Sequence, residues 1–230
     1  MDVTVEIRRG TKRFADRNVG RITWHSFSFG SHYDPERVGF GPMVCHDEHL
    51  LAAGQGFDTH HHEGVEIISW VLSGAVEHRD STGASTVLRP GEVGHLSSGS
   101  GVEHAEHAAG PQTRFVQVWL TAEEPDRPPS YDARPVTLEP GSFTEVLRPR
   151  SDATLSVAEL AAGDEVTLPE ARLRHLFVAS GALVRSSLAE PLAAGDAFEI
   201  TAPDESRTSG ADPVRVAAGV PTQLLLWSFA

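Results

Sequence analysis

The chain has 230 residues, enough for one large β domain or two small domains of roughly 100 residues each. Its 32 acidic and 19 basic residues give a formal net charge of −13, which argues against direct binding to nucleic acid or to an anionic membrane surface. The single cysteine, Cys45, cannot form an intramolecular disulfide, and no apolar run approaches the roughly 20 residues of a membrane span. No basic and apolar leader opens the sequence, so we expect a cytoplasmic protein.

The predicted elements are short β-strands separated by turns. Residues 65–72 (VEIISWVL) are rich in β-branched and aromatic side chains and end at a Ser-Gly turn signal. Further turn signals follow at residues 80–83 (DSTG) and 89–92 (RPGE), and residues 115–120 (FVQVWL) have the continuous apolar character of a buried strand. Many short strands without helical periodicity predict an all-β fold of the barrel or jelly-roll type.

The second half of the chain repeats the pattern of the first. Residues 71–76 (VLSGAV) match residues 178–183 (VASGAL), and residues 88–93 (LRPGEV) match residues 192–197 (LAAGDA). The strand ending at Trp119 also matches one ending at Trp227. Three matches in order at a nearly constant separation predict two copies of one β unit, the alternative being a chance alignment of short β-Gly-β patterns.

The proline-rich stretch 122–135 separates the two copies and reads as a linker. We therefore predict an N-terminal domain at residues 1–125 and a C-terminal domain at residues 136–230.

Histidine is concentrated in the first half, where all but one of the 12 histidines lie. In the segment THHHEGVE, His60 and His62 stand two residues apart. Residues i and i+2 of a strand project from the same face, so these two imidazoles lie together and His61 points away.

A second pair, His104 and Glu106, follows about forty residues later at the same i, i+2 spacing. Two strands that each offer two same-face ligands can close a four-ligand set inside a barrel. Imidazole and carboxylate ligands that leave open positions resemble the sites of non-haem iron oxygenases. We predict a metal site made of His60, His62, His104 and Glu106; the alternative is a solvated histidine patch.

The remaining histidines are predicted to be rim or structural residues. His61 and His107 are out of phase with the ligands, and His78 and His95 read as ordinary half-buried side chains on β-runs. The segment 45–49 (CHDEH) has no partner cluster and is predicted to be a loop before a strand. In the second copy, Thr167 and Pro169 align with the first histidine pair, and residues 208–212 with the second pair, so that copy has lost its ligands.

The sequence resembles two cupin motifs and, over roughly residues 20–120, the pirin family. The cupin motifs are His60-x-His62-x3-Glu66-x7-Gly74 and Gly101-x2-His104. The segments that resemble the pirin family are residues 24–29 (WHSFSF), 33–35 (YDP), 39–42 (GFGP), 54–60 (GQGFDTH), 71–74 (VLSG), 77–81 (EHRDS) and 98–101 (SGSG).

This resemblance implies two tandem cupin barrels, a bicupin, in which only the N-terminal barrel binds metal. It implies the ligands His60, His62, His104 and Glu106, with one divalent ion, Fe(II) by preference and Mn, Ni, Cu or Zn as alternatives. The chain departs from the family at His61, where proline is usual, and at residues 63–65, which bears on substrate identity.

Two questions remain open at the level of sequence. The first concerns Glu66, which is a metal ligand in many cupins and would face the same way as His60 and His62 if the strand is unbroken. Either Glu106 or Glu66 could therefore supply the carboxylate ligand, and either could act as the catalytic base. The resemblance implies quercetin 2,3-dioxygenase activity, with O2 and a flavonol or other phenol as substrates, ring opening and CO release. The alternatives are a metal- and redox-responsive regulator that binds a protein partner, and a cupin isomerase or other oxygenase.

Overall fold

The computed structural model describes residues 3–186, 191–202 and 213–230. In these ranges the chain is a succession of β-strands, with one short 3-10 helix, η1 (Gly10–Lys12), so the all-β prediction is confirmed. Within the same ranges, no helix has both the length and the apolar character needed to cross a membrane. The chain divides into two compact units, one formed by Arg13–Val136 and the other by Met1–Lys12 with Thr137–Ala230.

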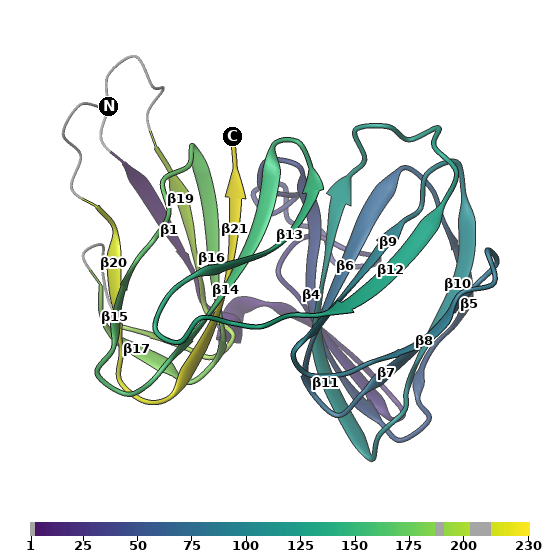
Figure 1. Cartoon of the computed structure of the whole chain (residues 1–230), viewed down its shortest axis with the longest axis horizontal. Helices are drawn as coiled ribbons and strands as arrows, with labels where there is room; N and C mark the ends of the chain where they lie inside the picture. The colour runs from purple at the N-terminus through teal and green to yellow at the C-terminus, as the bar shows by residue number, and fades with distance from the viewer. Residues whose placement is uncertain (1–2, 187–190, 203–212) are drawn as a thin grey trace. The chain divides into compact units, whose positions relative to one another are not determined.

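The unit Arg13–Val136 is a sandwich of two antiparallel sheets (Figure 1). Its larger sheet has the order β12-β9-β6-β11-β4-β3-β2, and its smaller sheet has the order β5-β10-β7-β8. A buried cluster takes Leu51, Val71 and Phe115 from the first sheet and Val76 and Leu88 from the second, so the two sheets pack face to face around an apolar core. The strands of the larger sheet are β2 (Phe14–Asn18), β3 (Arg21–His25), β4 (Met43–Ala52), β6 (Val65–Ser73), β9 (Glu92–Ser97), β11 (Gln112–Thr121) and β12 (Ser130–Pro135). Those of the smaller sheet are β5 (Gly56–His62), β7 (Val76–Asp80), β8 (Ser85–Leu88) and β10 (Val102–Ala108).

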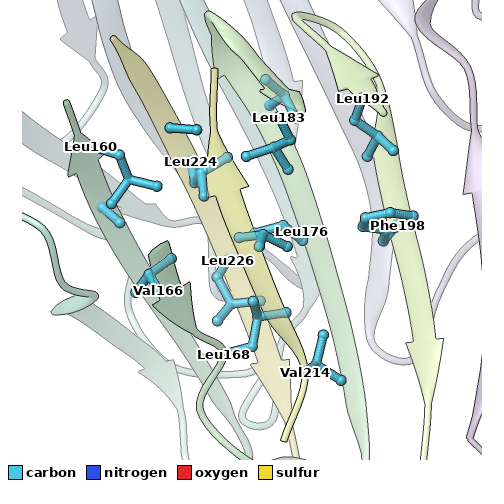
Figure 2. Packing of buried hydrophobic residues seen from close by; sticks show 14 of the residues in the cluster. Leu160, Val166, Leu168, Leu176, Leu183, Leu192, Phe198, Val214, Leu224 and Leu226 are labelled. Atoms are coloured by element: carbon cyan, nitrogen blue, oxygen red, sulfur yellow. The ribbon is translucent and has the colours of Figure 1, made fainter. Parts of the chain in front are cut away.

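The second unit has the same plan. Its sheets have the orders β1-β19-β16-β21-β14-β13 and β15-β20-β17-β18. The smaller sheet repeats the order of its counterpart in the first unit, and the larger sheet repeats six of the seven positions, with β2 unmatched among the described residues. Figure 2 shows its core, in which leucine, valine and phenylalanine side chains from both sheets meet. The strands are β1 (Thr4–Arg8), β13 (Thr144–Arg150), β14 (Ala153–Leu160), β15 (Glu165–Thr167), β16 (Leu173–Ser180), β17 (Ala182–Ser186), β18 (Leu192–Ala193), β19 (Ala197–Thr201), β20 (Arg215–Ala218) and β21 (Thr222–Phe229).

The two copies share one turn in detail. Gly74 and Gly181, each with a positive φ, end strands β6 and β16. A Cβ at either glycine would meet the backbone and threonine hydroxyl of the adjacent strand, Thr113 in one copy and Thr222 in the other. The repeat seen in the sequence therefore reflects one turn that only glycine can occupy, used twice.

The unit boundaries differ from the predicted ones at both ends. Strand β1, placed by sequence in the N-terminal domain, pairs with β19 from Thr4↔Thr201 to Arg8↔Ala197 and so belongs to the C-terminal unit. The stretch 122–135, predicted to be a linker, contains β12, which pairs with β9 and completes the N-terminal sheet. Both are edge strands, and the sheet that an edge strand joins is decided by its pairing with a strand far away in the chain, which the local sequence does not show.

The second copy carries no histidine on the strands that correspond to the predicted metal site. β15 (EVT) and β20 (RVAA) occupy the places that β5 and β10 take in the first unit. Residues 208–212, which the sequence aligned with His104 and Glu106, lie outside the described residues.

Candidate metal centre

Strands β5 and β10 of the N-terminal unit bring three histidines together. The two strands are antiparallel neighbours, with His60 opposite His104 and His62 opposite Val102. Their ring centroids lie 4.7 Å apart for His60 and His62, 4.4 Å for His60 and His104, and 5.0 Å for His62 and His104. One ring nitrogen from each lies within 4.8 Å of those of the other two, so these predicted ligands converge on one point.

The protonation state of these rings suits a metal ligand. The pKa of His62 is lowered to about 4, chiefly by burial and also by the neighbouring His104 and His60. Burial likewise lowers the pKa of His104 to about 3, with His60 and His78 as further contributors. Both imidazoles are therefore neutral at pH 7, the form with a nitrogen lone pair to donate.

The hydrogen bonding of the rings also fits an ion. His60 donates Nδ1–H to the carbonyl oxygen of Asp58 at 2.7 Å, so its Nε2 is left to act as a ligand. Nε2 of His62 and both ring nitrogens of His104 are buried without a hydrogen-bond partner. Unpaired buried nitrogens are unfavourable, and a divalent first-row ion satisfies them.

Glu106 lies beside this cluster on the same face of β10 as His104. Its side chain is buried, and Oε2 accepts a hydrogen bond of 2.7 Å from Nε2 of Gln117. Gln117 is held in turn by Trp119, whose Nε1 donates to its Oε1 at 3.0 Å. The Glu106 carboxylate forms a second group of potential ligands with His78 and His104, whose ligand atoms all lie within 4.8 Å of one another. His104 therefore belongs to two groups of potential metal ligands.

Glu66 occupies a different place from the one predicted. The strand is broken between β5 and β6, where Gly64 has a φ of 65°, so the alternation restarts and Glu66 loses the parity of His60 and His62. On β6, Ile67 packs into the interior cluster, whereas Glu66 points to the opposite face of the sheet. There Glu66 accepts hydrogen bonds from Nε2 of His95 at 2.7 Å and from the hydroxyl of Ser97 at 3.1 Å. The structure therefore places the Glu66 carboxylate away from the three histidines.

His78 is a site residue that the sequence reading set aside as half-buried. It lies directly opposite Glu106 in the β7–β10 pairing and is fully buried. Its Nε2 donates to Oδ2 of Asp80 at 2.9 Å, and its ring stacks on Tyr131 at 3.7 Å. The signal available in the sequence was the His-x-Asp spacing, which puts both side chains on one face of a strand.

The charge states of these neighbours follow from burial and hydrogen bonding. Burial tends to raise the pKa of Asp80, but hydrogen bonds from Thr82, His78 and the backbone outweigh it and hold that pKa below its ordinary value. Burial, followed by the nearby Glu106, raises the pKa of Tyr131, so its hydroxyl stays protonated. Asp80 is thus an ionised acceptor that fixes the proton of His78 on Nε2.

Segment 45–49 is part of strand β4, and the loop prediction is wrong. Strand β4 lies in the interior of the larger sheet between β3 and β11, which requires an extended chain despite the polar sequence. Its inward polar groups are paired within the barrel: His25 Nδ1 bonds Asp47 Oδ2 at 2.8 Å, and Thr23 Oγ1 bonds His49 Nδ1 at 2.9 Å. Burial, followed by Asp47, raises the pKa of Cys45 well above its ordinary value, so that cysteine is an inert core thiol.

An aromatic wall borders the histidines. The ring of Trp119 meets His62 edge-on at 4.6 Å, and Phe29 meets Trp119 edge-on at 5.5 Å. Phe29 also stacks on His25 at 5.0 Å and is 39% exposed. Aromatic rings therefore follow one another from the candidate metal ligand His62 to the partly exposed Phe29.

Comparison with known proteins identifies the family. Residues 8–120 match the sequence profile of the pirin family. A “putative quercetin 2,3-dioxygenase” of Mycobacterium tuberculosis is 36% identical over 246 aligned residues, which cover 99% of this chain and 96% of the relative. The chain belongs to the pirin family.

Two further relatives support the family and the fold. The quercetin 2,3-dioxygenase of Escherichia coli is 35% identical over 132 residues, covering 56% of this chain and 57% of that protein. The crystal structure of the bacterial pirin YhhW of E. coli in complex with nickel(II) superimposes with a TM-score of 0.85 at 25% identity, covering 98% of this chain and 99% of that one. This pirin is thus a bicupin of two β units, and its family binds a metal ion.

Proposed function

We propose that this pirin is a metal-dependent dioxygenase that cleaves a flavonol such as quercetin. The reaction would consume one O2, open the heterocyclic ring and release CO, with a ring-opened depside as the other product. The observation that carries the proposal is the convergence of three imidazoles, two of them with buried unpaired nitrogens, beside a buried carboxylate. The names of the mycobacterial and E. coli relatives support the same activity.

The residues that would hold the ion are His60, His62 and His104, with Glu106 as the fourth donor. Imidazole and carboxylate together suit Fe(II), which we favour, and also accommodate Mn, Ni, Cu or Zn. A bound divalent ion supplies Lewis acidity and lowers the pKa of a hydroxyl group that it contacts.

Glu106 is the residue we assign to proton transfer. Gln117 donates a hydrogen bond to Oε2, which leaves Oε1 to accept the proton of the flavonol 3-hydroxyl group. Because the Gln117 amide is anchored by Trp119 on one side and by Ser69 on the other, the carboxylate is held in one orientation.

The aromatic wall of Trp119 and Phe29 would bind the planar substrate. Offset or edge-on contacts between aromatic rings favour a flat, apolar ligand.

The test is turnover of quercetin by metal-loaded protein under oxygen, followed by chromatography of the depside and measurement of CO. We expect His62→Ala to reduce the rate by about 100-fold or more, because it removes a ligand. The matched control is His61→Ala, an adjacent imidazole whose side chain is 55% exposed and lies outside both donor groups. Absence of depside with every metal tested, or equal rates for wild type and His62→Ala, would refute the assignment.

A further inference from the structure

A second group of potential ligands lies deeper in the same barrel. One ligand atom each from His78, His104 and Glu106 lies within 4.8 Å of the others. These residues are only 1%, 1% and 4% exposed, whereas His60 and His62 are partly exposed. The barrel therefore presents an outer triad, His60, His62 and His104, and an inner triad, His78, His104 and Glu106, which share His104.

His78 is oriented as metal-binding histidines are. Such histidines donate the proton of one ring nitrogen to a carboxylate or carbonyl, which leaves the other nitrogen as the ligand. Nε2 of His78 is bonded to the buried carboxylate of Asp80 at 2.9 Å, and Nδ1 is buried without a hydrogen-bond partner. Tyr131 stacks on the ring with an interplanar angle of 7°, which fixes its plane.

Glu106 is equally constrained. The β10–β7 pairing sets Glu106 directly opposite His78 and sets His104 opposite Asp80. Gln117 holds one oxygen of the carboxylate. His78 and Glu106 thus each have a hydrogen-bond partner that fixes the orientation of the side chain. Such supporting hydrogen bonds are typical of protein metal sites.

We propose that His78, His104 and Glu106 form an inner metal-ion site, and that one divalent ion occupies either this site or the outer triad through the shared His104. This inference rests on the proposed metal centre and adds His78 to it as a ligand. An ion in the outer triad leaves Nδ1 of His78 unpaired, and an ion in the inner triad satisfies it. Removal of one outer ligand should therefore shift the ion inwards and not release it.

The experiment is a calorimetric titration of the metal-free full-length chain with Ni(II). Wild type should bind one equivalent, and His78→Ala should bind with nearly the same affinity because the outer triad is intact. His62→Ala should still bind one equivalent, with an affinity lower by about 10- to 100-fold. The double variant His62→Ala/His78→Ala should show no measurable binding.

A second variant keeps His78 in place. Asp80→Asn retains an oxygen to accept from the backbone NH groups of Thr82 and Ala84 but offers an NH2 group towards His78, which moves the imidazole proton to Nδ1. In the His62→Ala background, Asp80→Asn should therefore abolish Ni(II) binding as His78→Ala does. The matched control is His62→Ala/His107→Ala, since His107 lies outside both triads and should leave binding unchanged.

The outcomes separate this inference from the proposed function. If His62→Ala alone loses Ni(II) as completely as the double variant, the inner site is refuted while the outer site stands. If wild type binds no Ni(II), the metal centre itself fails, and the inner site with it. Circular dichroism and the melting temperature of each metal-free variant establish that it is folded.

Discussion

Gln117 offers a sharp test of how the candidate site is supported. Its amide donates to Glu106 at 2.7 Å and to Ser69 at 3.1 Å, and it accepts from Trp119 at 3.0 Å. The side chain is buried, so these bonds are shielded from water. Gln117→Leu preserves the approximate volume and removes all three bonds.

The magnitude follows from the kinds of bond lost. A hydrogen bond to a charged group contributes about 1.5–3 kcal/mol, and a neutral bond about 0.5–1.5 kcal/mol. Trp119 is partly exposed and can bond to water instead, so its loss contributes little. We expect Gln117→Leu to lower the free energy of unfolding of the metal-free chain by about 2–3 kcal/mol. Release of the Glu106 carboxylate should also weaken metal binding by about 10- to 100-fold.

The assays are urea unfolding of the metal-free chain and Ni(II) titration of the folded chain. Gln223→Leu is the matched control, because it breaks the same type of amide–carboxylate bond, to Glu159 at 3.0 Å, at an exposed position. That control should change stability by less than about 1 kcal/mol and leave Ni(II) affinity unaltered. If Gln117→Leu behaves like the control in both assays, the supporting role of Gln117 is wrong.

Three further predictions test the fold and the site. Gly74→Ala should lower the free energy of unfolding by about 2 kcal/mol or more, because a Cβ there meets the adjacent strand. The control Gly83→Ala, at a positive φ but with open space around it, should lower it by about 1 kcal/mol. Equal effects of the two variants in urea unfolding would contradict the steric argument. Burial lowers the pKa of His104 from 6.5 to about 3, so the unfolded chain binds more protons between these values, and the melting temperature of the metal-free chain should fall as the pH falls from 7 to 4.5. A flat profile would be inconsistent with buried neutral imidazoles. Glu106→Gln should lower both Ni(II) affinity and quercetin turnover by at least about 10-fold, whereas Glu66→Gln should leave both within about 2-fold, and the reverse order would restore Glu66 to the site.

Local sequence was sufficient to predict the strands around the metal centre. The run VEIISWVL predicted a strand that the structure extends to Val65–Ser73, and residues 115–120 lie within β11. The i, i+2 spacing of the two ligand pairs places His60 and His62, and His104 and Glu106, on common faces, because alternation is a property of any single strand.

Local sequence failed where the position of a residue depends on a turn or on a neighbouring strand. Glu66 was assigned the parity of His60, but the turn at Gly64 separates two strands with independent alternation. Segment 45–49 was predicted to be a loop because the sequence showed no partner cluster for it, although its polar side chains find partners inside the barrel. Such pairing is not visible in a single segment, since the partners come from distant strands.

The sequence by itself determined that the chain is all-β, that one β unit occurs twice, and which two same-face pairs are candidate metal ligands. These properties reside in strand alternation, in glycine turns and in residue chemistry, all of which are local. Only the tertiary structure decided that β1 completes the C-terminal sheet, that Glu66 faces away from the histidines, and that His78 stands opposite Glu106. Those outcomes depend on which strands pair and in which register, and register is set by packing among segments far apart in the chain.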